Sequence, residues 1–214
     1  MKFICRHWYN IGLIPGIIAV IYLITGWNNL DTLVKVQLLS FIAIIVHQFE
    51  EYGFPGREPA IMNLALQGSD IPDRYPLNQF SAMFTNCVVT YTMYLLPIFF
   101  PNIIWLGLAP ILMGVVQLIP HAVMTNIKMK SIYNPGLGAV VFLHTPIAIN
   151  YKNYITSNNL VTGNDWLFGI IYLILVAGLI VGFMTYKVLP NRNTKYIFAE
   201  EEMKRFNVKE KMGL

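Results

Sequence analysis

Apolar residues gather in six segments of the chain, separated by polar connections. A helix that crosses the hydrocarbon core of a bilayer needs about 17 to 25 predominantly apolar residues. The fifth segment is short and contains Pro146, so it meets this requirement least well. The pattern predicts an all-α fold, a polytopic membrane helical bundle of about six transmembrane helices, at residues 9–27, 33–51, 81–100, 102–124, 136–151 and 166–189.

The sequence changes character after the last apolar segment. We expect residues 1–190 to form a single transmembrane helical domain and residues 191–214 to form a cytoplasmic tail. The tail alternates charged and apolar residues, which predicts a short amphipathic helix around Glu200, Glu201, Glu202, Lys204, Arg205, Phe206 and Val208. The longest connection, residues 52–79, is either a solvated linker or a lid over a site, with a short interfacial helix at residues 60–66.

The composition agrees with a membrane setting. Hydrophobic residues make up 56% of the chain and charged residues 12%, whereas soluble domains average about 45–50% and about 25%. The net charge of +4 also suits basic cytoplasmic loops, so we expect no nucleic-acid partner. Cys5 and Cys87 provide neither a disulfide framework nor a CxxC metal motif.

The distribution of lysine and arginine predicts the orientation, because cytoplasmic loops of membrane proteins carry an excess of both. In a six-span topology with a cytoplasmic N-terminus, 13 of the 15 basic residues fall on the cytoplasmic side, and only Lys35 and Lys152 fall on the other. Without the fifth span, the basic residues of the tail would move to the wrong side. Both termini are therefore expected in the cytoplasm.

Ionisable groups are concentrated where the second segment ends, in the run His47-Gln48-Phe49-Glu50-Glu51-Tyr52. On a helix, His47 lies three residues before Glu50 and four before Glu51, so its imidazole shares a face with either carboxylate. Charged groups at the edge of a hydrophobic span are costly unless they are paired, solvated or used. This run is therefore the first candidate site.

The same run carries a family resemblance. His47, Glu50 and Glu51 form an HxxEE motif, followed by Tyr52 and by Pro55-Gly56, and the chain resembles the bacterial HXXEE-domain membrane proteins. Further matching positions extend the resemblance over about residues 30–150: Asn86, His121, Asn126 and Tyr133-Asn134-Pro135-Gly136. The resemblance implies a multi-pass protein of the bacterial cytoplasmic membrane and a set of site residues, and it implies no settled activity.

In the six-span topology, these polar residues share one level near the cytoplasmic face, although four helices contribute them. His144 lies two turns deeper, and Gln117 lies one turn before His121, where it can orient an imidazole nitrogen. Structural alternatives exist, because the asparagines can cap helices and the Tyr-Asn-Pro-Gly run is typical of a turn. We expect one pocket around the HxxEE residues and His121, with these supporting residues: Asn86, Gln117, Asn126, Tyr133, Asn134 and His144.

Two chemistries suit this set of residues. Imidazoles and carboxylates bind zinc or iron, which predicts a divalent metal held by His47, Glu50 and His121, with Glu51 as the alternative carboxylate. Without a metal, Glu50 and Glu51 form a catalytic acid–base pair, because one of two neighbouring carboxylates keeps its proton. In a structural alternative, Arg57 neutralises the carboxylates in an ion pair.

The function expected from this site is that of an enzyme, metal-assisted or acid–base, acting on a membrane lipid or lipophilic small molecule that arrives from the bilayer. Two alternatives belong to other classes, a small proton-coupled transporter and a non-catalytic membrane assembly protein. The position of the polar layer at one face, and the lack of an internal repeat, speak against the transporter.

Overall fold

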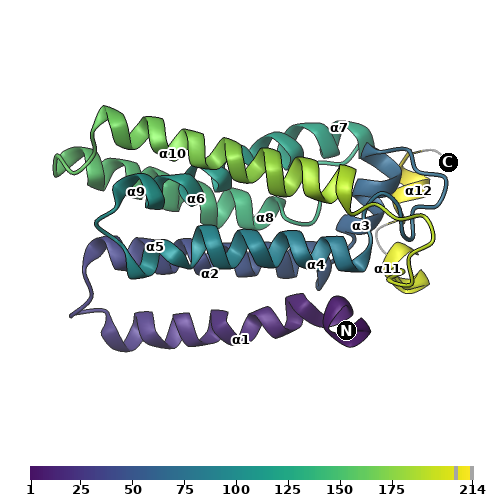
Figure 1. Cartoon of the computed structure of the whole chain (residues 1–214), viewed down its shortest axis with the longest axis horizontal. Helices are drawn as coiled ribbons and strands as arrows, with labels where there is room; N and C mark the ends of the chain where they lie inside the picture. Colours follow the sequence, from purple (N-terminus) through teal and green to yellow (C-terminus); the bar gives the residue numbers. More distant parts are fainter. Residues whose placement is uncertain (205–206, 213–214) are drawn as a thin grey trace.

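The computed structural model of the protein describes residues 1–204 and 207–212, and this part of the chain is all-helical, so the predicted fold class is confirmed (Figure 1). In the described part, five helical stretches are long and apolar enough to cross a membrane, as in a multi-pass membrane protein. They are α1 (Lys2–Gly26), α2 (Thr32–Tyr52), and three runs of consecutive elements. The runs are α4 (Gln79–Val88), η2 (Val89–Tyr94) and α5 (Leu96–Phe99); α6 (Ile104–Val116), η3 (Ile119–Thr125) and α7 (Asn126–Met129); and α10 (Gly163–Leu175) with η5 (Val176–Val188).

A sixth helical stretch precedes α10 in the chain. It consists of α8 (Leu137–Ala139), η4 (Val140–His144) and α9 (Thr145–Ser157). This stretch packs against α2 and α6, and it buries Tyr151 and Ile155 completely. With it, the described bundle has about six long helical stretches, which agrees with the number expected from the sequence.

Local sequence explains where several helices begin. Asp31 caps α2 by accepting a hydrogen bond from a backbone N–H two residues further on, at 2.7 Å. At the start of α4 (Gln79–Val88), Asn78 and Ser81 form a capping box, in which each side chain binds the backbone of the other residue. Thr162 and Asp165 form the same arrangement before α10 (Gly163–Leu175).

Stretches of π-helix interrupt the long helices, and prolines explain most of them. Pro97 follows η2, Pro120 lies within η3 and Pro146 follows η4, and each proline lacks the N–H that an α-helix would use. The backbone then widens by a residue, a change that is frequent at functional sites. Two histidines lie on these widened stretches, His121 on η3 (Ile119–Thr125) and His144 on η4.

Helix α2 is the centre of the bundle. Within its apolar stretch 61% is buried, against 22% for α1 and 17% for α10 with η5. Figure 1 shows α1 along one side of the bundle, and its exposed face is apolar, with Ile14, Ile17 and Ile18 all more than half exposed. An apolar exposed face is expected of a helix that contacts lipid, whereas the polar residues of α2 face protein.

Both chain termini lie at one end of the bundle, which we call the terminal end (Figure 1). There the long connection folds into α3 (Glu58–Ala60) and η1 (Ile61–Leu66), so the helix expected at residues 60–66 is present. Its buried side chain Ile61 packs in one cluster with Met129 from α7. The connection is therefore folded onto the transmembrane helices at the end where the HxxEE run lies.

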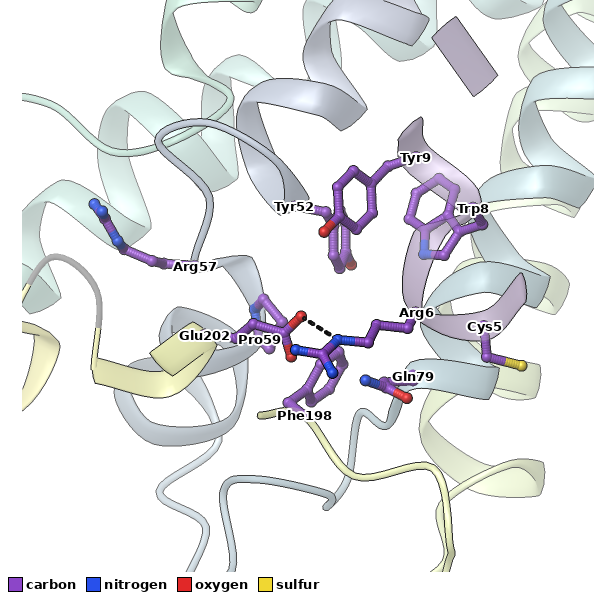
Figure 2. A pocket seen from close by; sticks show the side chains of 10 residues that line it. All are labelled: Cys5, Arg6, Trp8, Tyr9, Tyr52, Arg57, Pro59, Gln79, Phe198 and Glu202. Atoms are coloured by element: carbon purple, nitrogen blue, oxygen red, sulfur yellow. Dashed lines mark ion pairs between the residues drawn. The ribbon is translucent and has the colours of Figure 1, made fainter. Parts of the chain in front are cut away.

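The C-terminal segment also packs onto the terminal end. It forms α11 (Glu200–Lys204) and α12 (Val208–Met212), whereas Arg205 and Phe206 of the predicted tail helix lie outside the described residues. Figure 2 shows a small pocket where Phe198 packs with Trp8 and Tyr52. Beside them Arg6 pairs with Glu202, with 3.6 Å between Nε and Oε1. The tail therefore covers the ends of α1 and α2.

Candidate metal centre

Three buried side chains converge at the terminal end of α2. His47 and Glu51 lie one turn apart on α2, and His121 reaches them from η3. The Nε2 atoms of the two imidazoles lie 3.2 Å and 3.3 Å from the same carboxylate oxygen, Oε1 of Glu51. The three residues are 1%, 7% and 4% exposed, and their ligand atoms all lie within 4.8 Å of one another. A single cation could contact all three.

The other nitrogen of each imidazole is held by a carbonyl oxygen. Nδ1 of His47 donates to the backbone oxygen of Gly136 at 3.2 Å, and Nδ1 of His121 donates to Oδ1 of Asn134 at 2.7 Å. Because a carbonyl oxygen only accepts hydrogen bonds, both Nδ1 atoms carry a hydrogen. In a neutral imidazole this leaves a lone pair on Nε2, the arrangement found in metal-binding histidines.

The orientation of Asn134 is set by its own hydrogen bonds. Its amide nitrogen donates to the backbone oxygen of His121 and to Oδ1 of Asn126, both at 2.7 Å. Asn126 in turn donates to the backbone oxygen of Ile132 at 3.2 Å. The amide oxygen of Asn134 must therefore be the atom that faces His121, and Asn126 supports the site through Asn134.

Gly136 has a left-handed backbone that favours glycine, with φ of 98°. A Cβ atom built on it would lie 2.4 Å from Cε1 of His121. The turn made by Tyr133-Asn134-Pro135-Gly136 thus contacts both histidines. The backbone oxygen of Gly136 binds His47, and the amide oxygen of Asn134 binds His121, whose ring also packs against Gly136. The turn predicted from the sequence is also part of the site.

Glu50 faces a different part of the protein. Its carboxylate accepts hydrogen bonds from the Tyr133 hydroxyl at 2.7 Å and from the backbone N–H groups of Gly138 and Ala139 at 3.0 Å and 2.8 Å. It therefore caps the start of the stretch that begins with α8, where unpaired N–H groups favour a negative charge. The metal set expected first contained Glu50, whereas the structure groups Glu51, its alternative, with the histidines.

The other predicted supporting residues divide into two groups. The His144 ring lies 5.7 Å from the His47 ring, centroid to centroid, so this residue borders the centre. Asn86 instead accepts a hydrogen bond from Gln48 at 3.2 Å and donates to a backbone oxygen within α4. Gln117 contributes its backbone oxygen, which accepts from the His121 N–H at 3.2 Å, while Asn134 holds the imidazole.

One further acidic residue near the centre was missed by the sequence analysis. Glu58 lies at the start of α3, outside the transmembrane stretches. Burial, followed by the negative charge of Glu51, raises the pKa of Glu58 to about 8. Its sequence position, beside a proline in the long connection, carries no periodic signal, so only the folding of that connection onto the bundle brings it close.

The HxxEE run, both histidines and the turn after residue 132 also lie within one family match. The family described as "Protein of unknown function with HXXEE motif" matches residues 38–151. The chain belongs to this HXXEE family. No curated protein and no solved structure matches the chain. All three converging residues of this HXXEE protein lie inside the matched region, and so do Asn134 and Gly136.

Proposed function

We propose that this HXXEE protein is a metal-dependent membrane enzyme in which His47, Glu51 and His121 hold a divalent metal, zinc or iron. The observation that carries the proposal is the approach of two Nε2 atoms to one carboxylate oxygen, while both Nδ1 hydrogens are bound by carbonyl oxygens. Atoms that carry lone pairs repel one another unless a proton or a metal ion lies between them.

The number of ligands favours catalysis over a purely structural site. Structural zinc sites use four protein ligands, whereas catalytic sites use three and leave a position open, and two histidines with one carboxylate also suit iron. A divalent metal held by these three residues would supply a Lewis acid and would lower the pKa of a coordinated water. Glu58 adds a carboxyl group near the centre whose pKa is raised by burial, as proton transfer near neutral pH requires.

The surroundings of the centre favour a lipophilic substrate or a membrane lipid. A hollow between α2 and the stretch of α8 and η4 is lined by apolar side chains: Val46, Phe49, Phe54, Phe142 and Leu143. Phe54 and Phe142 are more than three-quarters exposed. Glu50 and Tyr133 add polar groups to this hollow, and its connection to the centre runs through the turn in which Gly136 holds His47.

The terminal end is assigned to the cytoplasm in this proposal, on the excess of basic residues in the connections at that end. The substrate then reaches the centre from the cytoplasmic leaflet. Reporter enzymes fused after Leu214 test the orientation. A reporter that is active only in the cytoplasm should be active, and activity of a reporter that needs export would contradict the orientation.

Elemental analysis of the purified protein, expressed with zinc and iron supplied, tests the metal. We expect stoichiometric metal in the wild type and its loss in His47→Ala and His121→Ala. His7→Ala is the matched control, because His7 lies on α1 outside the converging group and should not change metal content. A metal-free wild type would reject the metal and leave a protonated histidine paired with Glu51.

A further inference from the structure

A row of buried polar side chains leads away from the metal centre, and the proposed function uses none of them. The hydroxyls of Ser40 and Tyr94 and Nε2 of His144 have no hydrogen-bond partner among the described residues. The amide of Gln37 makes no hydrogen bond of normal geometry there, although its side chain interacts with that of Tyr151. Ser40, Tyr94, His144 and Gln37 are 1%, 0%, 3% and 0% exposed. Each such group lowers stability in a dry core, so several together require a cause.

The four residues follow one line through the bundle. Gln37, Ser40 and His47 recur at spacings of three and seven on α2 and so share one face of the helix. At about 1.5 Å per residue, this face extends roughly 15 Å from His47 to Gln37. The His144 ring lies 5.7 Å from that of His47 and 6.1 Å from that of Tyr94. The row therefore starts at the centre and runs toward the opposite end.

Helix α6 (Ile104–Val116) meets this row with two glycines spaced two turns apart. A Cβ on Gly114 would lie 2.5 Å from Nδ1 of His144, and a Cβ on Gly107 would lie 2.3 Å from Nε2 of Gln37. Both polar heads therefore approach the α6 backbone, and neither could keep its place beside a larger residue. The glycines leave room for the His144 and Gln37 side chains at both ends of the row. Polar residues buried at random would not be matched by glycines in this way.

We propose that this row binds a chain of water molecules, which extends from the metal centre to Gln37. A buried water makes two to four hydrogen bonds and so can satisfy neighbouring groups that cannot reach each other. Beyond Gln37, the buried cluster of Leu33, Ile104 and Ile155 closes the row with apolar side chains. The chain supplies water to a centre whose ligands are almost fully buried. This use rests on the proposed function, whereas the waters themselves require no metal.

Radiolytic hydroxyl-radical labelling tests the water chain in the intact protein in lipid nanodiscs. Radicals formed from bound water oxidise the side chains beside it. We expect Tyr94 and His144 to be oxidised several-fold faster than Phe41, which packs in the same cluster as Tyr94 but has no polar side-chain atom, and faster than Met129, which is equally buried in another cluster. Methionine is intrinsically easy to oxidise, so Met129 is a stringent control. Labelling of Tyr94 and His144 at or below the control rates would overturn the proposal.

The variant Tyr94→Phe provides a second test, because it removes one hydroxyl and keeps the ring. If the hydroxyl binds water, the variant should melt at a lower temperature, and oxidation of His144 should fall. If the hydroxyl is dry and unpaired, the variant should melt at a higher temperature with oxidation of His144 unchanged, and the proposal fails. Labelling of His121→Ala separates the two proposals. If this variant loses its metal but Tyr94 is still oxidised, the water chain does not depend on the metal. If Tyr94 is not oxidised in a wild type that contains metal, the water chain is rejected and the metal site is not.

Discussion

Glu50 and Glu51 are neighbours on α2, yet their carboxylates lie in opposite chemical surroundings. Glu50 meets three hydrogen-bond donors, one hydroxyl and two backbone N–H groups. Glu51 meets two Nε2 atoms whose imidazoles already place their hydrogens elsewhere. A rotation of about 100° per residue around the helix is enough to separate the two roles. One carboxylate is satisfied by three hydrogen-bond donors, whereas the other needs a proton or a metal ion between it and the imidazoles.

Both surroundings depend on the same short turn. Gly136 presents its carbonyl oxygen to His47 on the Glu51 side, and two residues later Gly138 presents its N–H to Glu50. The start of α8 therefore fixes a helix cap and a proposed metal ligand at once. Substitutions in this turn should show whether stability depends more on the surroundings of Glu50 or on those of Glu51.

The largest effect is expected from Gly136→Ala. A Cβ there would collide with the His121 ring, and its φ of 98° strains any residue except glycine. Strain and overpacking together predict a loss of about 2–6 kcal/mol in the free energy of unfolding. Gly138→Ala should cost less, because this position has no strained backbone and its Cβ would meet only the carboxylate of Glu50, at 2.8 Å. Denaturant unfolding in detergent measures both.

Gly178→Ala is the control for these glycine substitutions, since no atom lies within 4 Å of its added Cβ. It should leave the free energy of unfolding unchanged or slightly raise it, because alanine favours a helix over glycine. Equal losses in all three variants would contradict the importance assigned to the turn.

A smaller loss in the free energy of unfolding is expected from Glu50→Gln. The neutral amide keeps the shape of the side chain but loses charge-assisted hydrogen bonds at a helix start, which predicts about 1.5–3 kcal/mol of destabilisation. Tyr133→Phe removes one of the three donors and should cost less than Glu50→Gln. Thermal unfolding with metal content measured in parallel tests this, and loss of metal in Glu50→Gln would show that the two carboxylates are not separate.

Asn134→Ala should weaken metal binding without abolishing it. The variant removes the oxygen that holds Nδ1 of His121, and losses of such supporting contacts typically lower metal affinity about 10- to 100-fold. Gln117→Ala is the matched control, because Gln117 contributes only its backbone oxygen to the described contacts of His121. Competition titration with a zinc chelator compares the variants, and an equal loss in both would contradict the role of Asn134.

A further effect concerns pH and Glu58. In the metal-free protein its folded-state pKa of about 8 lies above the usual value of 4.5, so the folded state holds the proton more tightly. Stability is therefore lost as the pH rises from about 4.5 toward 8. Glu58→Gln should remove this part of the pH dependence and melt above the wild type at pH 8. If the melting temperatures of the wild type and of Glu58→Gln change with pH in the same way from 4.5 to 8, the raised pKa assigned to Glu58 is wrong.

Much of the site could be predicted from residues and topology. His47 and His121 are 74 positions apart in sequence, yet the membrane topology places both at the same depth, and their rings lie 5.0 Å apart. The all-α fold and the apolar stretches followed from hydrophobic patterning alone. Depth in the bilayer restricts which distant residues can meet, which is why membrane sequences reveal site composition comparatively well.

The choice between the two glutamates could not be made in this way. Positions three and four residues after His47 both lie on its face of the helix, so the decision came from the partners on other segments. Gln117 lies one helical turn before His121 and was expected to orient its imidazole. The structure shows that Asn134 holds this imidazole instead, because the turn brings its amide oxygen to Nδ1. Glu58 depends on how the long connection folds, which hydrophobic periodicity does not encode.

Zinc affinity of the pair Glu50→Gln and Glu51→Gln, measured by competition titration in detergent, tests the division between the two carboxylates most directly. The two variants carry the same chemical change at adjacent positions, so general effects of charge removal cancel. We predict that Glu51→Gln lowers the affinity by more than about 100-fold, beyond the range for supporting residues, and that Glu50→Gln stays near the wild type. Equal losses in both variants, or a greater loss in Glu50→Gln, would contradict the account.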